Sequence, residues 1–301
     1  MKKFVCTSLF LVAGLTIASA QQVKLSINPE KGKKYEYQTE TTQNVKQSVA
    51  GQEFLVEMET NTRFLQEIKD KTPQEITVQY TYQDMAYIVS SPMVKMFYDS
   101  KTPSENPSDI DQMLSKMFGK MMGQSFVAVY APDGSVKSLI GMDRIAESMV
   151  DAIAGDGPMI AQLGAQMKQQ FNDEVMKNMF EQSFKIYPDN AVKPGDTWNK
   201  NLSTTVNNMS TGFKTKYTLK SVSKNVATIT FSSEIEMNPP AEMGMEGKIS
   251  GTQTGTMTVD TKTGLPLTLN ANQEITGALK VQGMDVQMEL NTKTKGTIKE
   301  I

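Results

Sequence analysis

Apolar and polar residues alternate with a period of two near the start of the chain. The alternation runs through residues 34–90 and is interrupted by turns at 50–52 and 70–73. This period is typical of strands whose two faces meet different surroundings, and it predicts three long strands. The residues that share one face are Tyr35, Tyr37, Thr39 and Thr41, then Phe54, Val56, Met58, Thr60, Thr62 and Phe64, then Ile76, Val78, Tyr80 and Tyr82.

The spacing changes to that of helices after residue 107. A first helix is predicted by apolar residues at i, i+3, i+4, i+7, i+8 and i+11: Ile110, Met113, Leu114, Met117, Phe118 and Met121. Ser108 can cap this helix, with Asp111 three residues later in the capping-box position. We expect Gly123 to end it, and a short strand to follow at 126–130.

Two or three further helices are predicted before residue 184. The helical spacing returns over 142–153, and Pro158 suits the first position of another helix. Asn172 is typical of a helix start, before Met176 and Phe180.

From residue 197 the period of two returns. Strands are predicted at 213–219, 227–235, 249–259, 265–279 and 284–290, with a hairpin turn at 260–264. Lys, Thr, Asn and Gln occupy the opposite faces, which is typical of an antiparallel sheet with one solvated face. In total we expect eight or nine main strands and three or four helices.

These elements predict an α+β fold that is mainly β. A flat sheet of this size would leave its apolar face uncovered, so the sheet must curve and something must fill its concave side. We therefore expect a large curved antiparallel sheet, a half-barrel, with a helical insertion at about 107–184 packed on its concave face. Residues 21–301 would form this single domain.

Residues 1–20 have the pattern of a cleavable signal peptide. Lys2 and Lys3 precede an apolar stretch, and Ala18-Ser19-Ala20 is a cleavage motif, so we expect cleavage after Ala20. No later stretch has the roughly 20 apolar residues that a membrane-spanning helix needs. The product is expected in the periplasm or outside the cell, as a monomer.

Composition excludes several kinds of chemistry. The chain contains no histidine, and its single cysteine, Cys6, lies in the leader. Nucleophilic sites that use His or Cys, disulfides, and zinc sites with His or thiolate ligands are therefore excluded. Without the leader, 29 basic and 33 acidic side chains remain, which argues against nucleic acid as a partner.

Methionine is abundant, with ten of the 22 residues between 107 and 184. Core packing explains flexible thioether side chains there, and so does a deformable pocket for a lipid or another apolar ligand. In that second interpretation the cavity is lined by Met113, Met117, Phe118, Met121, Met167, Met176 and Phe180. A third interpretation, Cu(I) binding by thioethers, is less favoured because the same helical face carries Leu114 and Phe118. We expect no cofactor and no metal.

Carboxylates offer the remaining route to acid–base catalysis. Glu57 and Glu59 share one strand face, and Asp143, Glu147 and Asp151 share one helix face. Both sets have the spacing of solvated surfaces, so no catalytic residue is assigned. The single tryptophan, Trp198, follows the Pro194-Gly195 turn, where it is expected to form a structural corner.

Several turn motifs together resemble a known family. They are Tyr98-Asp99-Ser100, Ile186-Tyr187-Pro188, the segment 193–198 (KPGDTW), and Asp260-x-x-Thr263-Gly264-Leu265-Pro266. On these residues the chain resembles a domain-of-unknown-function family of exported proteins from Bacteroidetes-type bacteria. The family brings no catalytic residues with it. The expected architecture is also distantly similar to the half-barrels of lipoprotein carriers.

Three hypotheses follow. The first is a non-enzymatic envelope protein that binds a lipid-like or other apolar ligand in a Met-rich cavity. The second is an interaction or scaffold module with a filled core, whose partner is another envelope protein. The third, less favoured, is a carboxylate-dependent hydrolase.

Overall fold

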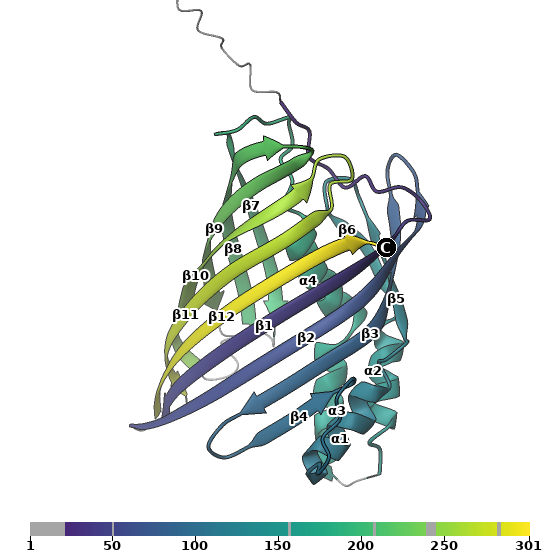
Figure 1. The fold of residues 1–301 in the computed structure, drawn as a ribbon. Helices are drawn as coiled ribbons and strands as arrows, with labels where there is room; N and C mark the ends of the chain where they lie inside the picture. Colours follow the sequence, from purple (N-terminus) through teal and green to yellow (C-terminus); the bar gives the residue numbers. More distant parts are fainter. Residues whose placement is uncertain (1–21, 50, 156–157, 207–208, 239–244, 282–283) are drawn as a thin grey trace, which may run out of the picture.

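A computed structural model describes residues 22–49, 51–155, 158–206, 209–238, 245–281 and 284–301. The predicted leader and its cleavage site lie outside the described residues. Most of the described chain forms one large antiparallel sheet of twelve strands (Figure 1). The strands are β1 (Lys34–Val49), β2 (Gln52–Lys71), β3 (Ile76–Ser90), β4 (Lys95–Asp99), β5 (Ser125–Tyr130), β6 (Val136–Ile140), β7 (Thr197–Val206), β8 (Met209–Ser223), β9 (Val226–Asn238), β10 (Met245–Asp260), β11 (Pro266–Val281) and β12 (Met284–Glu300).

The strand order places the first and the last strand of the sheet, β1 and β12, side by side in its middle. From edge to edge it is β6-β5-β3-β2-β1-β12-β11-β10-β9-β8-β7, and β4 pairs with β3 beside this path. Strand β1 pairs with β12 from Tyr35 opposite Glu300 to Val49 opposite Val286. The sheet curves strongly, so that its long strands enclose a concave side (Figure 1). The predicted half-barrel fold is confirmed.

Four helices connect the sheet's outer strands: α1 (Asp109–Gly119), α2 (Met142–Asp151), α3 (Pro158–Gln170) and α4 (Asp173–Phe184). Ser108 and Asp111 form the predicted capping box of α1, and Asn172 caps α4 as expected. The N-cap residue of helix α2 is Gly141, which has no side chain that could cap the helix. Its first backbone N–H, that of Met142, donates instead to Oδ1 of Asp173, 2.7 Å away, so α2 is capped from the start of α4.

The helices cover one half of the concave side. Phe180 and Phe184 of α4 pack on inward aromatic residues of the sheet: the Phe180 ring centroid lies 5.1 Å from that of Tyr80, and the Phe184 centroid lies 5.0 Å from that of Tyr130. Helix α4 contacts both edge strands, β6 and β7, so it bridges the gap between the two edges of the sheet. In the other half of the concave side, from β7 to β12 and β1, the last turn of α4 is the only part of a described helix that lies against the strands (Figure 1).

The segment before β1 closes one end of the concave side. Val23 pairs with Val192, and the backbone N–H of Ile27 donates to the carbonyl of Pro132 at 2.8 Å. This segment also lies against Gly264, whose φ of +68° lets the turn between β10 and β11 approach it closely. Leu25 and Ile27 of this segment are buried, and the segment runs across the upper end of the sheet in Figure 1.

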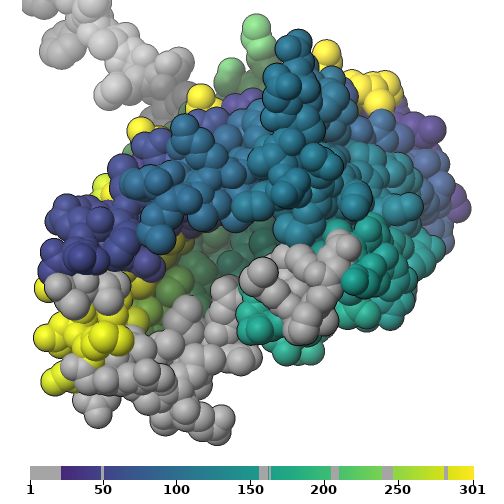
Figure 2. Space-filling view, turned by 90° about the horizontal axis from the view of Figure 1, so that it is seen from below, coloured from purple at the N-terminus to yellow at the C-terminus, as the bar shows by residue number. Residues whose placement is uncertain are grey.

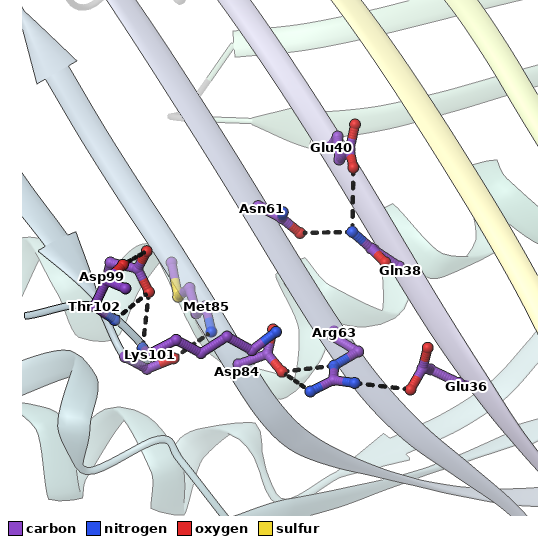
Figure 3. A network of polar contacts seen from close by, with 11 residues as sticks. Glu36, Gln38, Glu40, Asn61, Arg63, Asp84, Met85, Asp99, Lys101 and Thr102 are labelled. Atoms are coloured by element: carbon purple, nitrogen blue, oxygen red, sulfur yellow. Dashed lines mark hydrogen bonds and ion pairs between the residues drawn. The ribbon is translucent and has the colours of Figure 1, made fainter.

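A charged network stabilises the convex face where β3 bulges. Nε of Arg63 on β2 donates to Oδ2 of Asp84 at 2.5 Å, and its guanidinium donates to Glu36 on β1 at 2.9 Å. Lys101, in the loop after β4, lies 3.1 Å from the other oxygen of Asp84 (Figure 3). The network thus connects three strands and a loop at the point where the β2–β3 register shifts.

The structure corrects several predicted bounds. Twelve strands replace the eight or nine expected, because β4, β6 and β7 gave too little alternation to be recognised. Helix α1 ends at Gly119 rather than Gly123. Within the 107–184 insertion, β5 confirms the strand predicted at 126–130, and β6 is an additional strand that extends the sheet.

Candidate functional site: a cavity on the concave face

A cavity of about 280 Å³ lies between the last turn of α4 and the strands that no other helix covers. Its apolar lining includes Phe184 of α4, Ile186 just after it, and Tyr37, Leu202, Phe213, Tyr217, Phe231, Met257, Leu269 and Ile298 from the strands. This volume is close to the lower end of the range of about 300–1,000 Å³ that small-molecule sites occupy. Seen from below, the molecule is hollowed, with the green strands at the back of the hollow (Figure 2).

A glycine on β10 leaves space for one aromatic ring of the cavity lining. Gly255 of β10 faces inward opposite Phe231, and the Phe231 ring lies so close over it that a Cβ there would collide with the ring. A small residue beneath a large one lets the aromatic ring lie flat against the sheet. At the cavity's upper end, Trp198 donates from Nε1 to the carbonyl of Ile186 at 2.7 Å, and its ring stacks on Tyr217. The predicted corner at Trp198 is therefore confirmed.

A row of polar side chains crosses this mostly apolar face. Each member pairs in the sheet register with the next: Thr215 on β8, Ser233 on β9, Gln253 on β10, Gln273 on β11, Thr292 on β12 and Gln43 on β1. We call this row the polar belt. The first four members line the cavity.

Hydrogen bonding within the polar belt is incomplete. The Thr215 and Ser233 hydroxyls lie 2.7 Å apart and are buried. Oγ1 of Thr292 is also buried, but it has no hydrogen-bond partner among the described residues. A buried polar atom without a partner costs free energy, but Thr292 is not among the residues that line the cavity.

The cavity is electrically neutral. Of the described residues that line it, none is Asp, Glu, Lys or Arg. Burial raises the pKa of Tyr37 to about 12 and that of Tyr217 to about 12, so both hydroxyls stay protonated at physiological pH. The lining therefore offers neutral donors and acceptors only.

The residues predicted to form a ligand cavity lie elsewhere in the core. Met117, Phe118, Met121 and Met176 are buried, whereas Met113, Met167 and Phe180 are partly buried against the same core. None of the seven is among the described residues that line the 280 Å³ cavity. The Phe118 ring packs on Tyr98 at 5.3 Å and on Tyr87 at 5.5 Å, so α1 covers β3 and β4. A ligand role for these seven stays a prediction.

One signal in the sequence could have located the cavity residues. Thr215, Ser233, Gln253 and Gln273 interrupt faces whose other inward residues are mostly apolar. Such interruptions at matching depths in successive strands indicate a polar row. The carboxylates considered for catalysis, Glu57, Glu59, Asp143, Glu147 and Asp151, are all exposed. The described residues contain no group of three or more acidic, His or Cys side chains that could hold a metal ion.

No helix in the described part of the chain is long and apolar enough to cross a membrane.

Among solved structures, lipovitellin, in a structure described by its lipid–protein interactions, matches with a TM-score of 0.47 and 10% identity. That match covers 90% of this chain and 26% of the lipovitellin chain, so this chain spans about a quarter of its length. An outer membrane channel from Pseudomonas putida F1 matches with a TM-score of 0.25 and 7% identity, covering 91% of this chain and 97% of the channel.

OccK7 from Pseudomonas aeruginosa also has a TM-score of 0.25, with 6% identity over 90% of this chain and 100% of its own. No curated protein matches the chain in sequence. Residues 73–266 match the model of a family of unknown function, DUF6263.

Proposed function

The chain belongs to this family of unknown function, since the match spans more than half of its length, and we propose that it is a non-enzymatic protein that binds a lipid-like molecule. The observation that carries the proposal is the largely apolar cavity of about 280 Å³ between α4 and the uncovered strands. Burying an apolar ligand there gains about 25 cal/mol per Å² of surface removed from water. The N-terminal segment closes one end, and Figure 2 shows a hollow at the other, through which a ligand would enter.

The proposal includes an exported location. Residues 1–20 are proposed as a cleaved leader, and residues 21–301 as a single half-barrel domain in the periplasm or outside the cell. An exported binding protein of this kind would shield the apolar part of its ligand from water.

Native mass spectrometry of the protein purified from its own envelope tests the proposal, together with organic extraction of any bound species. We expect one stoichiometric lipid-like species. Ala271 faces the cavity on β11, so Ala271→Phe should fill it and abolish the bound mass. Asn272→Phe, on the exposed face of the same strand, is the matched control and should retain the bound species. A mass without ligand for the wild type, unchanged after incubation with envelope lipids, would contradict the proposal.

A second candidate function is an interaction module that binds another envelope protein. It is favoured by exposed apolar side chains at three hairpins at the lower end of the sheet: Leu55 is 48% exposed, Met93 78% and Met284 49% (Figure 1). Cross-linking in cells should then capture one partner with the wild type and lose it with Met93→Ser. Met179→Ser, at a methionine on α4 that is 50% exposed, is the control. Recovery of the monomer alone would reject this candidate.

A further inference from the structure

The polar belt lies partway along the cavity, with apolar residues on both sides of it. On β11, Gln273 faces inward between Ala271 and Ile275, and Leu269 follows farther toward the closed end. At about 3.3 Å per residue, Leu269 lies about 13 Å along the strand from Gln273. A molecule inside the cavity therefore meets the belt between mostly apolar side chains, and the hydroxyl of Thr294 on β12 is a further neutral polar group on the closed-end side.

The side chains of the polar belt can form hydrogen bonds but carry no charge. The amides of Gln253 and Gln273, opposite each other on β10 and β11, each carry donors and an acceptor. Lys200 is the next register neighbour of Thr215 at the sheet edge, but its amine is paired with Asp189 at 2.7 Å. A carboxylate or phosphate at the belt would therefore be buried without a free cation among the described lining residues, which is strongly unfavourable.

We infer that the ligand is an uncharged amphiphile with an ester, amide or hydroxyl group at the depth of the polar belt and an apolar chain toward the closed end. This inference rests on the proposed function and specifies its ligand class. The ligand's neutral group would form hydrogen bonds with the amides of Gln253 and Gln273, which line the cavity. A pure hydrocarbon would leave these groups without partners, and a fatty acid would place a charge among them.

The test compares three probes of similar chain length on the full mature protein. They are 1-monooleoylglycerol (uncharged, with ester and hydroxyl groups), oleate (a carboxylate) and 1-octadecene (a hydrocarbon). Binding is measured by displacement of the fluorescent probe N-phenyl-1-naphthylamine. We expect 1-monooleoylglycerol to displace it at least about tenfold more tightly than either other probe, which corresponds to one or two net hydrogen bonds.

A double substitution locates the effect at the belt. Gln253→Leu with Gln273→Leu should remove the preference for 1-monooleoylglycerol over 1-octadecene while retaining binding of both. Gln287→Leu is the matched control, because Gln287 lies on the exposed face of β12. It should keep the wild-type preference.

The outcomes separate the two proposals. If none of the probes displaces the fluorophore, the proposed function fails and this inference fails with it. If all three bind equally, or oleate binds best, the binding function stands and the inference is wrong. The wild-type ranking decides this even if the double variant does not fold. A preference lost equally in the Gln287→Leu control would also overturn the assignment to the belt.

Discussion

The buried tyrosine pair between β3 and β5 provides a sharp test of the core. The hydroxyls of Tyr80 and Tyr130 lie 2.7 Å apart, and the two residues are only 2% and 1% exposed. Replacing either residue by Phe deletes one hydroxyl and leaves the other buried without this partner. The loss should be about 1–3 kcal/mol of unfolding free energy for each single variant. The Tyr80→Phe/Tyr130→Phe double variant removes both polar groups, so it should lose clearly less than the sum.

The pair therefore makes a double-mutant cycle with an expected coupling of about 1–2 kcal/mol. Urea unfolding of the four proteins, followed by the fluorescence of Trp198 and by circular dichroism, measures it. Burial raises the pKa of both tyrosines well above 10, so the coupling should be the same at pH 6 and pH 9. Tyr87→Phe is the control and should lose less, because among the described residues the Tyr87 hydroxyl contacts only the sulfur of Met58, at 3.6 Å. Losses that simply add in the double variant would refute the reasoning.

Three further predictions concern stability. Gly264→Ala should cost at least about 1–3 kcal/mol in urea unfolding, because its φ is positive and the new Cβ would collide with the backbone of Ser26; an unchanged midpoint would contradict this. Asp84→Asn should cost about 1–3 kcal/mol by removing the charged partner of Arg63, and the cost should shrink in 1 M NaCl; a loss that does not depend on salt would argue against an ionic contribution. Phe184→Ala should cost about 3–5 kcal/mol by thermal or urea unfolding and enlarge the cavity, and a loss below 1 kcal/mol would show that α4 does not depend on this contact.

The sequence predicted the fold class because alternation is strong wherever a strand has one buried face. It failed where strands are short or lie near the edges of the sheet. β4 and β6 have five residues each, too few for a period of two to stand out. β7 is an edge strand with many polar residues, so little in its pattern separates it from a loop.

The end of α1 shows how local geometry departs from spacing. The N–H of Lys120 donates to the carbonyl of Met117, and that of Met121 to Phe118, so tight turns follow the helix. These turns keep Met121 on the buried side after the α-helix has ended at Gly119. Apolar spacing alone could not distinguish a longer α-helix from a helix followed by tight turns, because both conformations place Met121 in the core.

The candidate site was harder to predict than the fold. The abundance of methionine between 107 and 184 correctly indicated buried apolar surface, but it could not show which half of the sheet the helices cover. The covered half is determined by the position of α4. Phe180 and Phe184 of this helix pack on aromatic residues of β3 and β5, and the helix also contacts β7. The cavity belongs to the strands left uncovered, and in the sequence these differ only by the polar interruptions that form the belt.

The pairing of β1 with β12 also determines when the sheet can be completed. Strands β1–β6 and β7–β12 each form from neighbouring segments, whereas the contact of Tyr35 with Glu300 joins the two ends of the chain. Contacts between such distant segments form late in folding, because closing the long loop costs entropy before any contact compensates for it. Until β12 is in place, β1 and β11 are both open edges that can pair with another copy. Loss of β12 alone should therefore divide the single sheet into two smaller sheets, each with an open edge that can pair with another copy.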